Sequence, residues 1–300
     1  MRKNIEFFSE GLKCKGWFYL PADREEGQKV PAIVMAHGFS AVKEMYLSDY
    51  AERFVSSGLA VLVFDYRYLG EGEGEPRGQV LPHIQLNDYR NAISWVSRQA
   101  EVDPGRIGVW GTSYSGGHVL HLGAFDRRIK AVVSQVPNIC GWRSILKNGG
   151  IEGLRFLQEM VAADRTSAYP EEVHYFPVVA PEGQPAVLGT PDAYEFFQST
   201  GEDARANWIN KVTLESVEKM IESDPAGAIE IISPTALMIV AAEQDVLIPI
   251  EVVREAFKRA GEPKKLVEIP CGHFDVYDKQ PFHEQAVGEA EQWFIEHLLG

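Results

Sequence analysis

Short apolar segments alternate along this chain with longer segments in which apolar residues recur every three or four positions. The longer segments, such as residues 48–57 and 84–100, have the spacing of amphipathic helices. The short ones carry few polar side chains on either face, which is typical of strands in the middle of a parallel sheet. They comprise residues 32–36, 60–64, 107–110, 131–136 and 235–240. The alternation predicts an α/β fold whose largely parallel sheet is covered by helices on both faces.

Both ends of the chain extend this pattern. Residues 5–8 and 16–20 have the composition of two opening strands. Near the other end, a helix at residues 251–259 is followed by a last strand at 264–269 and by an amphipathic helix at 285–299. These strands, with the buried ones above, give a sheet of eight strands.

The sequence changes character between the strands at 131–136 and 235–240. Residues 139–230 contain helical stretches with a proline-rich and aromatic-rich span between them. We interpret this part as a mainly helical cap inserted into a core formed by residues 1–138 and 231–300. Its aromatic side chains exceed what a surface loop needs, so we expect some to form the cap's own core and others to line a substrate pocket. The candidate pocket residues of the cap are Trp142, Phe176 and Trp208.

The strand at 107–110 leads into a turn of small residues, Gly111-Thr-Ser-Tyr-Ser-Gly-Gly117, and then into a helical run. A serine on a tight turn between strand and helix has its hydroxyl pushed out from the edge of the sheet. Backbone N–H groups at the start of the helix point toward the same space. This geometry suits a nucleophile, Ser113, whose attack creates an oxyanion.

The segment Gly111-Thr-Ser-Tyr-Ser-Gly116 resembles the nucleophile elbow of α/β-hydrolases, although position 115 is Ser where the usual G-x-S-x-G pattern has Gly. The form G-x-S-Y-x-G is similar to the branch that holds X-prolyl peptidases, cocaine-esterase-like enzymes and dienelactone-hydrolase-like proteins. Residues 35–45, 114–120 and 133–137 also resemble the polyketide acyl transferases of this superfamily. The resemblance implies an α/β-hydrolase fold, with a mostly parallel eight-stranded sheet flanked by helices and an inserted, mainly helical cap.

The sequence His37-Gly-Phe-Ser40 directly follows the strand at 32–36. In α/β-hydrolases the corresponding loop carries one N–H of the oxyanion hole. The resemblance therefore gives this role to the backbone of Phe39, with Tyr114 supplying the other N–H. We interpret His37 mainly as a histidine that holds the loop, because the donor is expected to be main chain; its alternative role is in the substrate pocket.

Two further groups complete the pattern of a catalytic triad. Asp245 comes just after the strand at 235–240, where the family keeps its triad carboxylate, and Glu243 is its rival. His273 lies just after the last strand, in a segment that resembles the loop of the triad histidine. Ser113, Asp245 and His273 thus follow the order nucleophile, acid, base that is expected of α/β-hydrolases.

The resemblance implies a serine esterase that cleaves carboxylic esters through an acyl-enzyme intermediate. Three alternatives stay open: an acyl transferase that passes the acyl group to an alcohol, a peptidase, and a non-enzymatic binding protein on the same fold. Acyl transfer by a triad needs no cofactor and no metal, and we expect neither. His118 and His121 lie three residues apart, but no third ligand has a recognisable spacing, so helix packing is the better interpretation.

Composition narrows the choice of partner. The chain has 300 residues, 45% of them hydrophobic, and a net charge of −14, which argues against nucleic acid or an anionic membrane. Cys14, Cys140 and Cys271 have no metal-type spacing, and we interpret them as reduced thiols of a cytoplasmic protein. We expect no signal peptide and no membrane span. The expected partner is a small ester or acyl substrate, and the sequence leaves open whether the chain forms a homo-oligomer.

Overall fold

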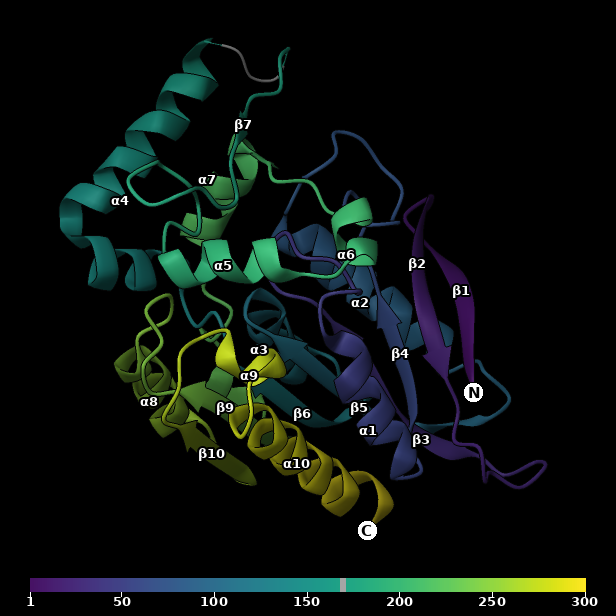
Figure 1. Ribbon diagram of the computed structural model, residues 1–300. Coiled ribbons are helices and arrows are strands. Elements are labelled where there is room, and N and C mark those ends of the chain that lie inside the picture. The colour runs from purple at the N-terminus through teal and green to yellow at the C-terminus, as the bar shows by residue number, and fades with distance from the viewer. Residues whose placement is uncertain (168–170) are drawn as a thin grey trace.

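The computed structural model describes residues 1–167 and 171–300 (Figure 1). Within these residues, eight strands form one continuous sheet. In spatial order they are β1 (Arg2–Ser9), β2 (Leu12–Tyr19), β4 (Ala60–Phe64), β3 (Val30–Ala36), β5 (Val102–Thr112), β6 (Ile129–Gln135), β9 (Ala236–Ala242) and β10 (Lys264–Ile269). β2 runs antiparallel to both β1 and β4, and all other neighbours are parallel. The expected eight-stranded, mostly parallel sheet is confirmed.

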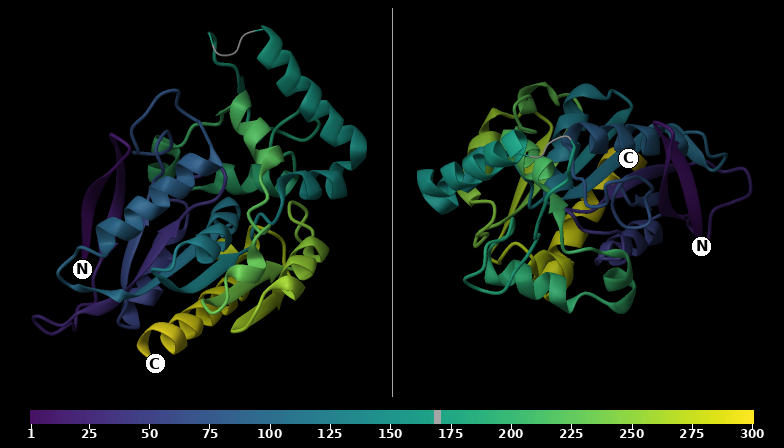
Figure 2. Two further views of the ribbon diagram at one scale, coloured as in Figure 1. Left: turned by 180° about the vertical axis from the view of Figure 1, so that it is seen from behind. Right: turned by 90° about the horizontal axis from the view of Figure 1, so that it is seen from above.

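Helices cover both faces of the sheet (Figures 1 and 2). On one face α1 (Leu47–Ser56) packs beside α10 (Phe282–Phe294), which continues as the π-helical turn η2 (Ile295–Leu299). On the other face lie α2 (Pro82–Val96), α3 (Tyr114–Phe125) and α8 (Ile250–Arg259). Because both faces are covered, every residue of β3, β4 and β9 is buried, which accounts for their unbroken apolar sequences.

The start of β5 differs from the sequence-based expectation. Residues 102–106 have the composition of a turn, but the strand already begins at Val102, which pairs with Val30 of β3. The register then shifts before Ile107 pairs with Ala32. Asp103 accepts a hydrogen bond from the Gly105 N–H at 2.9 Å, so the turn-forming residues are accommodated as an irregularity within the strand.

A mainly helical segment connects β6 to β9 and lies over the carboxyl ends of the central strands (Figure 1). Its long helix α4 is kinked at Gly150, where φ is 65°. Its elements are α4 (Gly141–Ser167), β7 (Tyr175–Phe176), α5 (Pro191–Ser199), α6 (Glu202–Asn207), β8 (Val212–Thr213), α7 (Leu214–Glu222) and η1 (Ile229–Ile231). We call residues 136–235 the inserted segment; the division into core and cap at residues 139 and 230 stays a prediction.

Two expectations from the sequence concern the state of the cysteines and the absence of a membrane-spanning helix. Cys14, Cys140 and Cys271 are buried free thiols. In the parts of the chain that the structure describes, no helix combines the length and apolar character needed to cross a bilayer.

Candidate active site

Ser113 lies between β5 and α3 in a conformation that few non-glycine residues adopt, with φ of 55° and ψ of −114°. Its backbone is held from both sides. The N–H of Ser113 donates to the Gln135 carbonyl at 2.8 Å, and its own carbonyl accepts from the Asn138 N–H at 2.8 Å. Strand β6 and the residues after it therefore fix the turn that carries the hydroxyl at the carboxyl edge of the sheet.

The glycines around Ser113 explain why this turn departs from G-x-S-x-G. A Cβ at Gly111 would lie 2.1 Å from the Ser115 carbonyl oxygen, and one at Gly116 would lie 2.8 Å from that of Gln135. Both positions are thus closed to a side chain, because strand and helix backbones pass too near. Position 115 accommodates a side chain, since Ser115 is fully buried and hydrogen-bonded there, whereas position 116 has room only for glycine.

His273 and Asp245, from the loops after β10 and β9, meet at Ser113. His273 Nε2 lies 3.1 Å from Ser113 Oγ, and His273 Nδ1 lies 2.6 Å from Asp245 Oδ2. Carboxylate oxygens accept hydrogen bonds, so Nδ1 carries the hydrogen and Nε2 turns its lone pair toward the serine hydroxyl. The other oxygen of Asp245 accepts from the N–H groups of Leu247 and Ile248 at 2.8 and 2.7 Å. Glu243, the rival acid, is exposed to solvent.

The loop after β3 also lies close to Ser113. A Cβ at Gly38 would lie 3.0 Å from Ser113 Cβ, so the loop backbone passes directly beside the nucleophile candidate. The rings of Phe39 and Tyr114 meet edge to face, with centroids 5.2 Å apart. Tyr114 is the first residue of α3, where a backbone N–H has no partner within the helix.

Ser115, which the sequence-based reasoning did not include in the site, ties this loop to the turn. Its hydroxyl donates to the backbone carbonyl of His37, and the Tyr66 hydroxyl lies 2.5 Å from the same Ser115 oxygen. All three side chains are buried. The one feature of the sequence that could have indicated this role was Ser115 itself, because the usual pattern has glycine at this position.

His37 is buried inside its own loop. Its Nδ1 lies 3.0 Å from the Gly38 carbonyl, and its Nε2 lies 3.6 Å from Asp65 Oδ1. Burial lowers the pKa of His37, while the negative charge of Asp65 acts in the opposite direction. This is the arrangement of a neutral histidine that holds the loop, although His37 also lines a small cavity beside Ser113 and His273.

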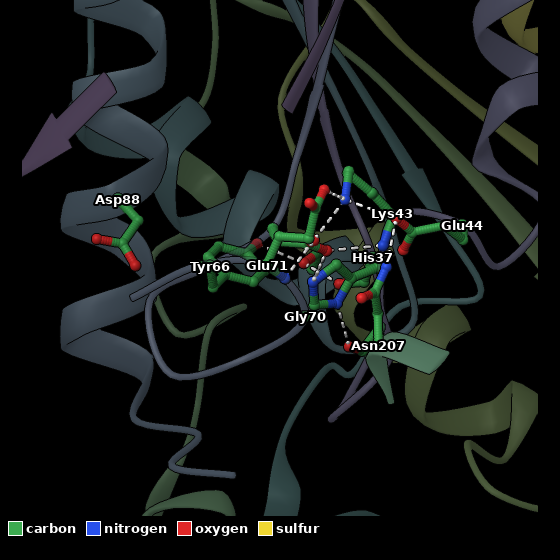
Figure 3. Close-up of polar contacts among 12 residues, drawn as sticks. His37, Lys43, Glu44, Tyr66, Gly70, Glu71, Asp88 and Asn207 are labelled. Carbon is green, nitrogen blue, oxygen red and sulfur yellow. Dashed lines mark hydrogen bonds and ion pairs between the residues drawn. The ribbon is translucent and has the colours of Figure 1, made fainter. Parts of the chain in front are cut away.

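A charged cluster with a buried centre contacts the same loop (Figure 3). The ammonium of Lys43 is fully buried and contacts Glu44 at 2.6 Å, Asp65 at 2.8 Å and Glu71 at 2.6 Å. The Lys43 N–H also donates to Asp65 at 2.8 Å, so the same carboxylate fixes the backbone of the loop. From the inserted segment, Asn207 donates to Glu44 at 3.1 Å. Sequence-based reasoning missed this cluster, whose residues come from three separate parts of the chain.

The three carboxylates of this cluster lie close enough together to suggest a metal site, with one oxygen of each within 4.8 Å of the others. The Lys43 ammonium, however, contacts all three carboxylates itself. Burial alone would lower the pKa of Lys43, but the charge of Asp65 and the hydrogen bonds to the carboxylates raise it. Burial and the charge of Asp65 raise the pKa of Glu44. The position between the three carboxylates is therefore taken by the Lys43 ammonium, so the side chains form an ionic cluster rather than an open cation site.

Two cavities meet at Ser113. The larger, of about 510 Å³, lies between the core and the inserted segment. The smaller, of about 20 Å³, includes His273 and has room for about one water molecule. Prominent apolar residues around the larger cavity are Phe39, Ile145, Leu157, Phe176, Met220 and Leu247. A cavity of this size with mostly apolar walls is typical of a site for a small molecule.

Of the cap residues expected at the pocket, Phe176 lines the larger cavity, but two others do not. Trp142 is 43% exposed and lines a separate surface hollow beside α8. Trp208 stacks on Phe197 with ring centroids 4.8 Å apart and packs against the apolar core. The expectation for these two tryptophans is wrong, because aromatic composition does not tell which side of a helix or loop faces a cavity.

The fold carries a serine on a strand-to-helix turn, and this serine is hydrogen-bonded to a histidine that is in turn hydrogen-bonded to an acid. Together, the fold and this arrangement define a protein of the α/β-hydrolase class. Within that class, the X-Pro dipeptidyl-peptidase (S15) family model matches residues 10–219, and the chain belongs to this family. The resemblance drawn from the sequence is thereby confirmed.

Three relatives show the range of activities around this chain. The quorum-quenching protein AidA of Acinetobacter baumannii is 33% identical, covering 93% of this chain and 90% of its own. The thiohydrolase aneE of Aspergillus aculeatus is 30% identical, over 97% of this chain and 90% of its own. The polyketide transferase grgF of a Penicillium species is 30% identical, over 91% of this chain and 90% of its own. The crystal structure of the α/β hydrolase GrgF from Penicillium sp. sh18 superimposes with a TM-score of 0.84 and 27% identity, and both chains are covered in full. The chain is thus an α/β-hydrolase with hydrolase-like and acyltransferase-like relatives.

Proposed function

We propose that this protein is a serine esterase that cleaves carboxylic esters of small acyl substrates through an acyl-enzyme intermediate. The observation that carries the proposal is the hydrogen-bonded series from Ser113 to His273 to Asp245, at 3.1 and 2.6 Å, with Ser113 lining a mostly apolar cavity. A serine hydroxyl is a weak nucleophile near neutral pH, and this arrangement supplies the base that activates it.

In the proposed reaction, Ser113 Oγ attacks the ester carbonyl while His273 Nε2 takes its proton. Asp245 holds the imidazole in the required tautomer and stabilises its positive charge. The backbone N–H groups of Phe39 and Tyr114 donate to the oxyanion of the tetrahedral intermediate. His273 then protonates the leaving alkoxide. Water attacks the acyl-enzyme by the same route, and Ser113 is regenerated.

An acyl transferase is the second candidate, and its support is the relative grgF, a polyketide transferase. The same three side chains would form the same acyl-enzyme, and an alcohol would replace water in the second step. The two candidates therefore differ in the acceptor alone. Adding a competing alcohol and separating the ester product from the acid product distinguishes them: a product that is mostly ester favours the transferase.

A peptidase, despite the family's name, has less support from the site. A substrate cleaved two residues from its N-terminus carries a protonated amine, and a buried cation needs an acidic partner. Among the described residues that line the two cavities at Ser113, none is Asp or Glu. We therefore propose esters ahead of peptides. Aminoacyl-p-nitroanilides that are cleaved faster than matched esters would reverse this order.

The proposal is tested by initial rates on p-nitrophenyl esters from acetate to decanoate. We expect Ser113→Ala to lower kcat by roughly 10⁵ to 10⁶, as loss of a triad nucleophile does. Ser56→Ala is the matched control, because Ser56 is an exposed serine whose hydroxyl donates to the Arg53 carbonyl on α1. Mass spectrometry after treatment with an organophosphonate should place the adduct on Ser113. A Ser113→Ala protein that keeps most of its esterase activity would overturn the assignment.

A further inference from the structure

The cavity at Ser113 contains polar groups whose capacity for hydrogen bonding is unused. Asn138 and Ser144 both line it, and their exposed fractions are 8% and 7%. Within the described chain, neither Asn138 Nδ2 nor Ser144 Oγ has a hydrogen-bond partner. The same holds for Oγ1 of Thr190, which lines the cavity at the start of α5. Buried polar atoms are nearly always paired, so the unpaired atoms of Asn138, Ser144 and Thr190 around one cavity point to an occupant that pairs with them.

The position of Asn138 places these groups close to the reacting centre. Its backbone N–H donates to the Ser113 carbonyl at 2.8 Å, and Ser144 follows in the first turn of α4. Another polar residue of the cavity, Asn148, differs in this respect. Asn148 lines the cavity, but its amide already donates to the carbonyls of Val246 and Leu247, at 2.7 and 2.9 Å. The unused capacity is thus found at particular residues and is not a general property of the lining.

The chemistry of the lining defines the occupant. No charged side chain is present among the described residues of the larger cavity, so a charged group would be left without a partner there. An amide N–H₂ and a hydroxyl both donate hydrogen bonds, and an uncharged oxygen accepts them. Apolar side chains form most of the remaining surface. The complementary ligand is an apolar chain that carries a neutral oxygen, such as a ketone or a hydroxyl group.

The two cavities also indicate which part of an ester this chain belongs to. In the proposed reaction His273 protonates the leaving group, so the leaving group lies on the side of His273. His273 is not part of the lining of the larger cavity, and the smaller cavity that it does line has room for about one water molecule and not for an acyl chain. The larger cavity therefore takes the acyl group.

We propose that Asn138 and Ser144 form a polar subsite that binds an uncharged oxygen on the acyl group, so that the preferred substrate is an oxygen-bearing acyl ester rather than a plain fatty acyl ester. This inference rests on the proposed esterase function and narrows its substrate class. A site built to pair with an oxygen discriminates against the analogue that lacks it, because its own donors are then buried without partners.

The test compares p-nitrophenyl octanoate with its 4-oxo, 5-oxo, 6-oxo and 7-oxo derivatives. We expect kcat/KM for at least one oxo ester to exceed that for octanoate by about tenfold in the wild-type protein. Asn138→Leu and Ser144→Ala should each bring this ratio toward one. Asn148→Leu is the matched control, since the amide of Asn148 is already hydrogen-bonded, and it should keep the ratio. Asn138 lies beside the serine turn, so Ser144→Ala carries the test if Asn138→Leu does not fold.

Ratios near one for every oxo ester in the wild type, or ratios unchanged in both variants, would overturn the subsite and mean that water satisfies these groups. Failure of the esterase proposal would be recognised separately, by absent turnover of octanoate and absent phosphonate labelling of Ser113. In that event, calorimetry with the Ser113→Ala protein still decides the inference. The methyl ester of the oxo acid should then bind about tenfold more tightly than methyl octanoate, and equal affinities would contradict the subsite.

Discussion

The hydroxyl of Ser115 donates a hydrogen bond to the backbone carbonyl of His37, so the serine turn after β5 and the loop after β3 are directly joined. Ser115 has one hydroxyl hydrogen and gives it to that carbonyl. The Tyr66 hydroxyl, 2.5 Å from Ser115 Oγ, must therefore be the donor in the second contact. The two segments joined in this way are those that supply the proposed oxyanion donors, Tyr114 and Phe39.

Removing this link should weaken catalysis without weakening substrate binding. We expect Ser115→Ala to lower kcat on p-nitrophenyl esters about tenfold and to change KM little, because the oxyanion exists only along the reaction path. Ser134→Ala is a suitable control, since Ser134 is also buried but its hydroxyl donates to the Gly116 carbonyl at 2.7 Å, away from the loop. A rise in KM at constant kcat would show instead that Ser115 shapes the pocket.

The assignment of the acid can be tested by two neutral substitutions. Asp245→Asn should lower kcat by about 10⁴, because an amide at that position favours the wrong tautomer of His273. Glu243→Gln should change kcat less than about twofold, because Glu243 is exposed while Asp245 contacts His273. Steady-state rates on one ester decide between the two acids. Equal losses in both variants, or a greater loss in Glu243→Gln, would contradict the assignment.

The charged cluster around Lys43 should matter mainly for stability. Lys43→Met leaves Glu44, Asp65 and Glu71 without their shared cation, and breaking a buried ionic group by removing one partner costs about 3–5 kcal/mol. Urea unfolding at neutral pH measures this cost. Lys265→Met provides the comparison, because Lys265 is 44% exposed in its pair with Glu289, and such surface pairs contribute about 0–1 kcal/mol. A similar small loss in both variants would mean that the cluster repacks or hydrates.

The core strands and the series from Ser113 to His273 were open to prediction because each has a local signal. Unbroken apolar segments mark β3, β4 and β9, and the small residues around Ser113 mark the turn. The short elements of the inserted segment lack such signals. Both β7 and β8 have two residues and α6 has six, and a pattern of hydrophobic periodicity cannot be recognised over so few positions.

The charged cluster and the pocket were beyond sequence reasoning for a different reason. Lys43 and Glu71 are 28 residues apart, and a lysine in a loop gives no sign that it will be fully buried. The burial of Lys43 depends on its contacts with Asp65 and Glu71, which belong to a different loop. Likewise, Phe176 and Trp142 are both aromatic residues of the inserted segment, yet only the packed structure separates a cavity wall from an exposed surface.

His118 gives the protein a predictable sensitivity to acid. It is buried on α3 with Nε2 2.8 Å from Gln85 Oε1, and burial lowers its pKa from 6.5 to about 3. Between these two values the unfolded chain binds a proton that the folded protein excludes, so the contribution of His118 to stability is fully present above pH 6.5 and is lost as the pH falls toward 3. From pH 7 to pH 5, this one group should remove about 2 kcal/mol from the free energy of unfolding.

The measurement is urea unfolding of the wild type and of His118→Gln at pH 7 and pH 5. The substitution changes packing as well as charge, so the quantity to compare is the loss of stability between the two pH values and not the stability itself. That loss should be about 2 kcal/mol smaller in His118→Gln than in the wild type. His83→Gln, at an exposed histidine of α2, should behave as the wild type does. An identical pH dependence in His118→Gln and the wild type would mean that the folded protein accommodates a protonated His118, since only then would folded and unfolded chains bind that proton equally.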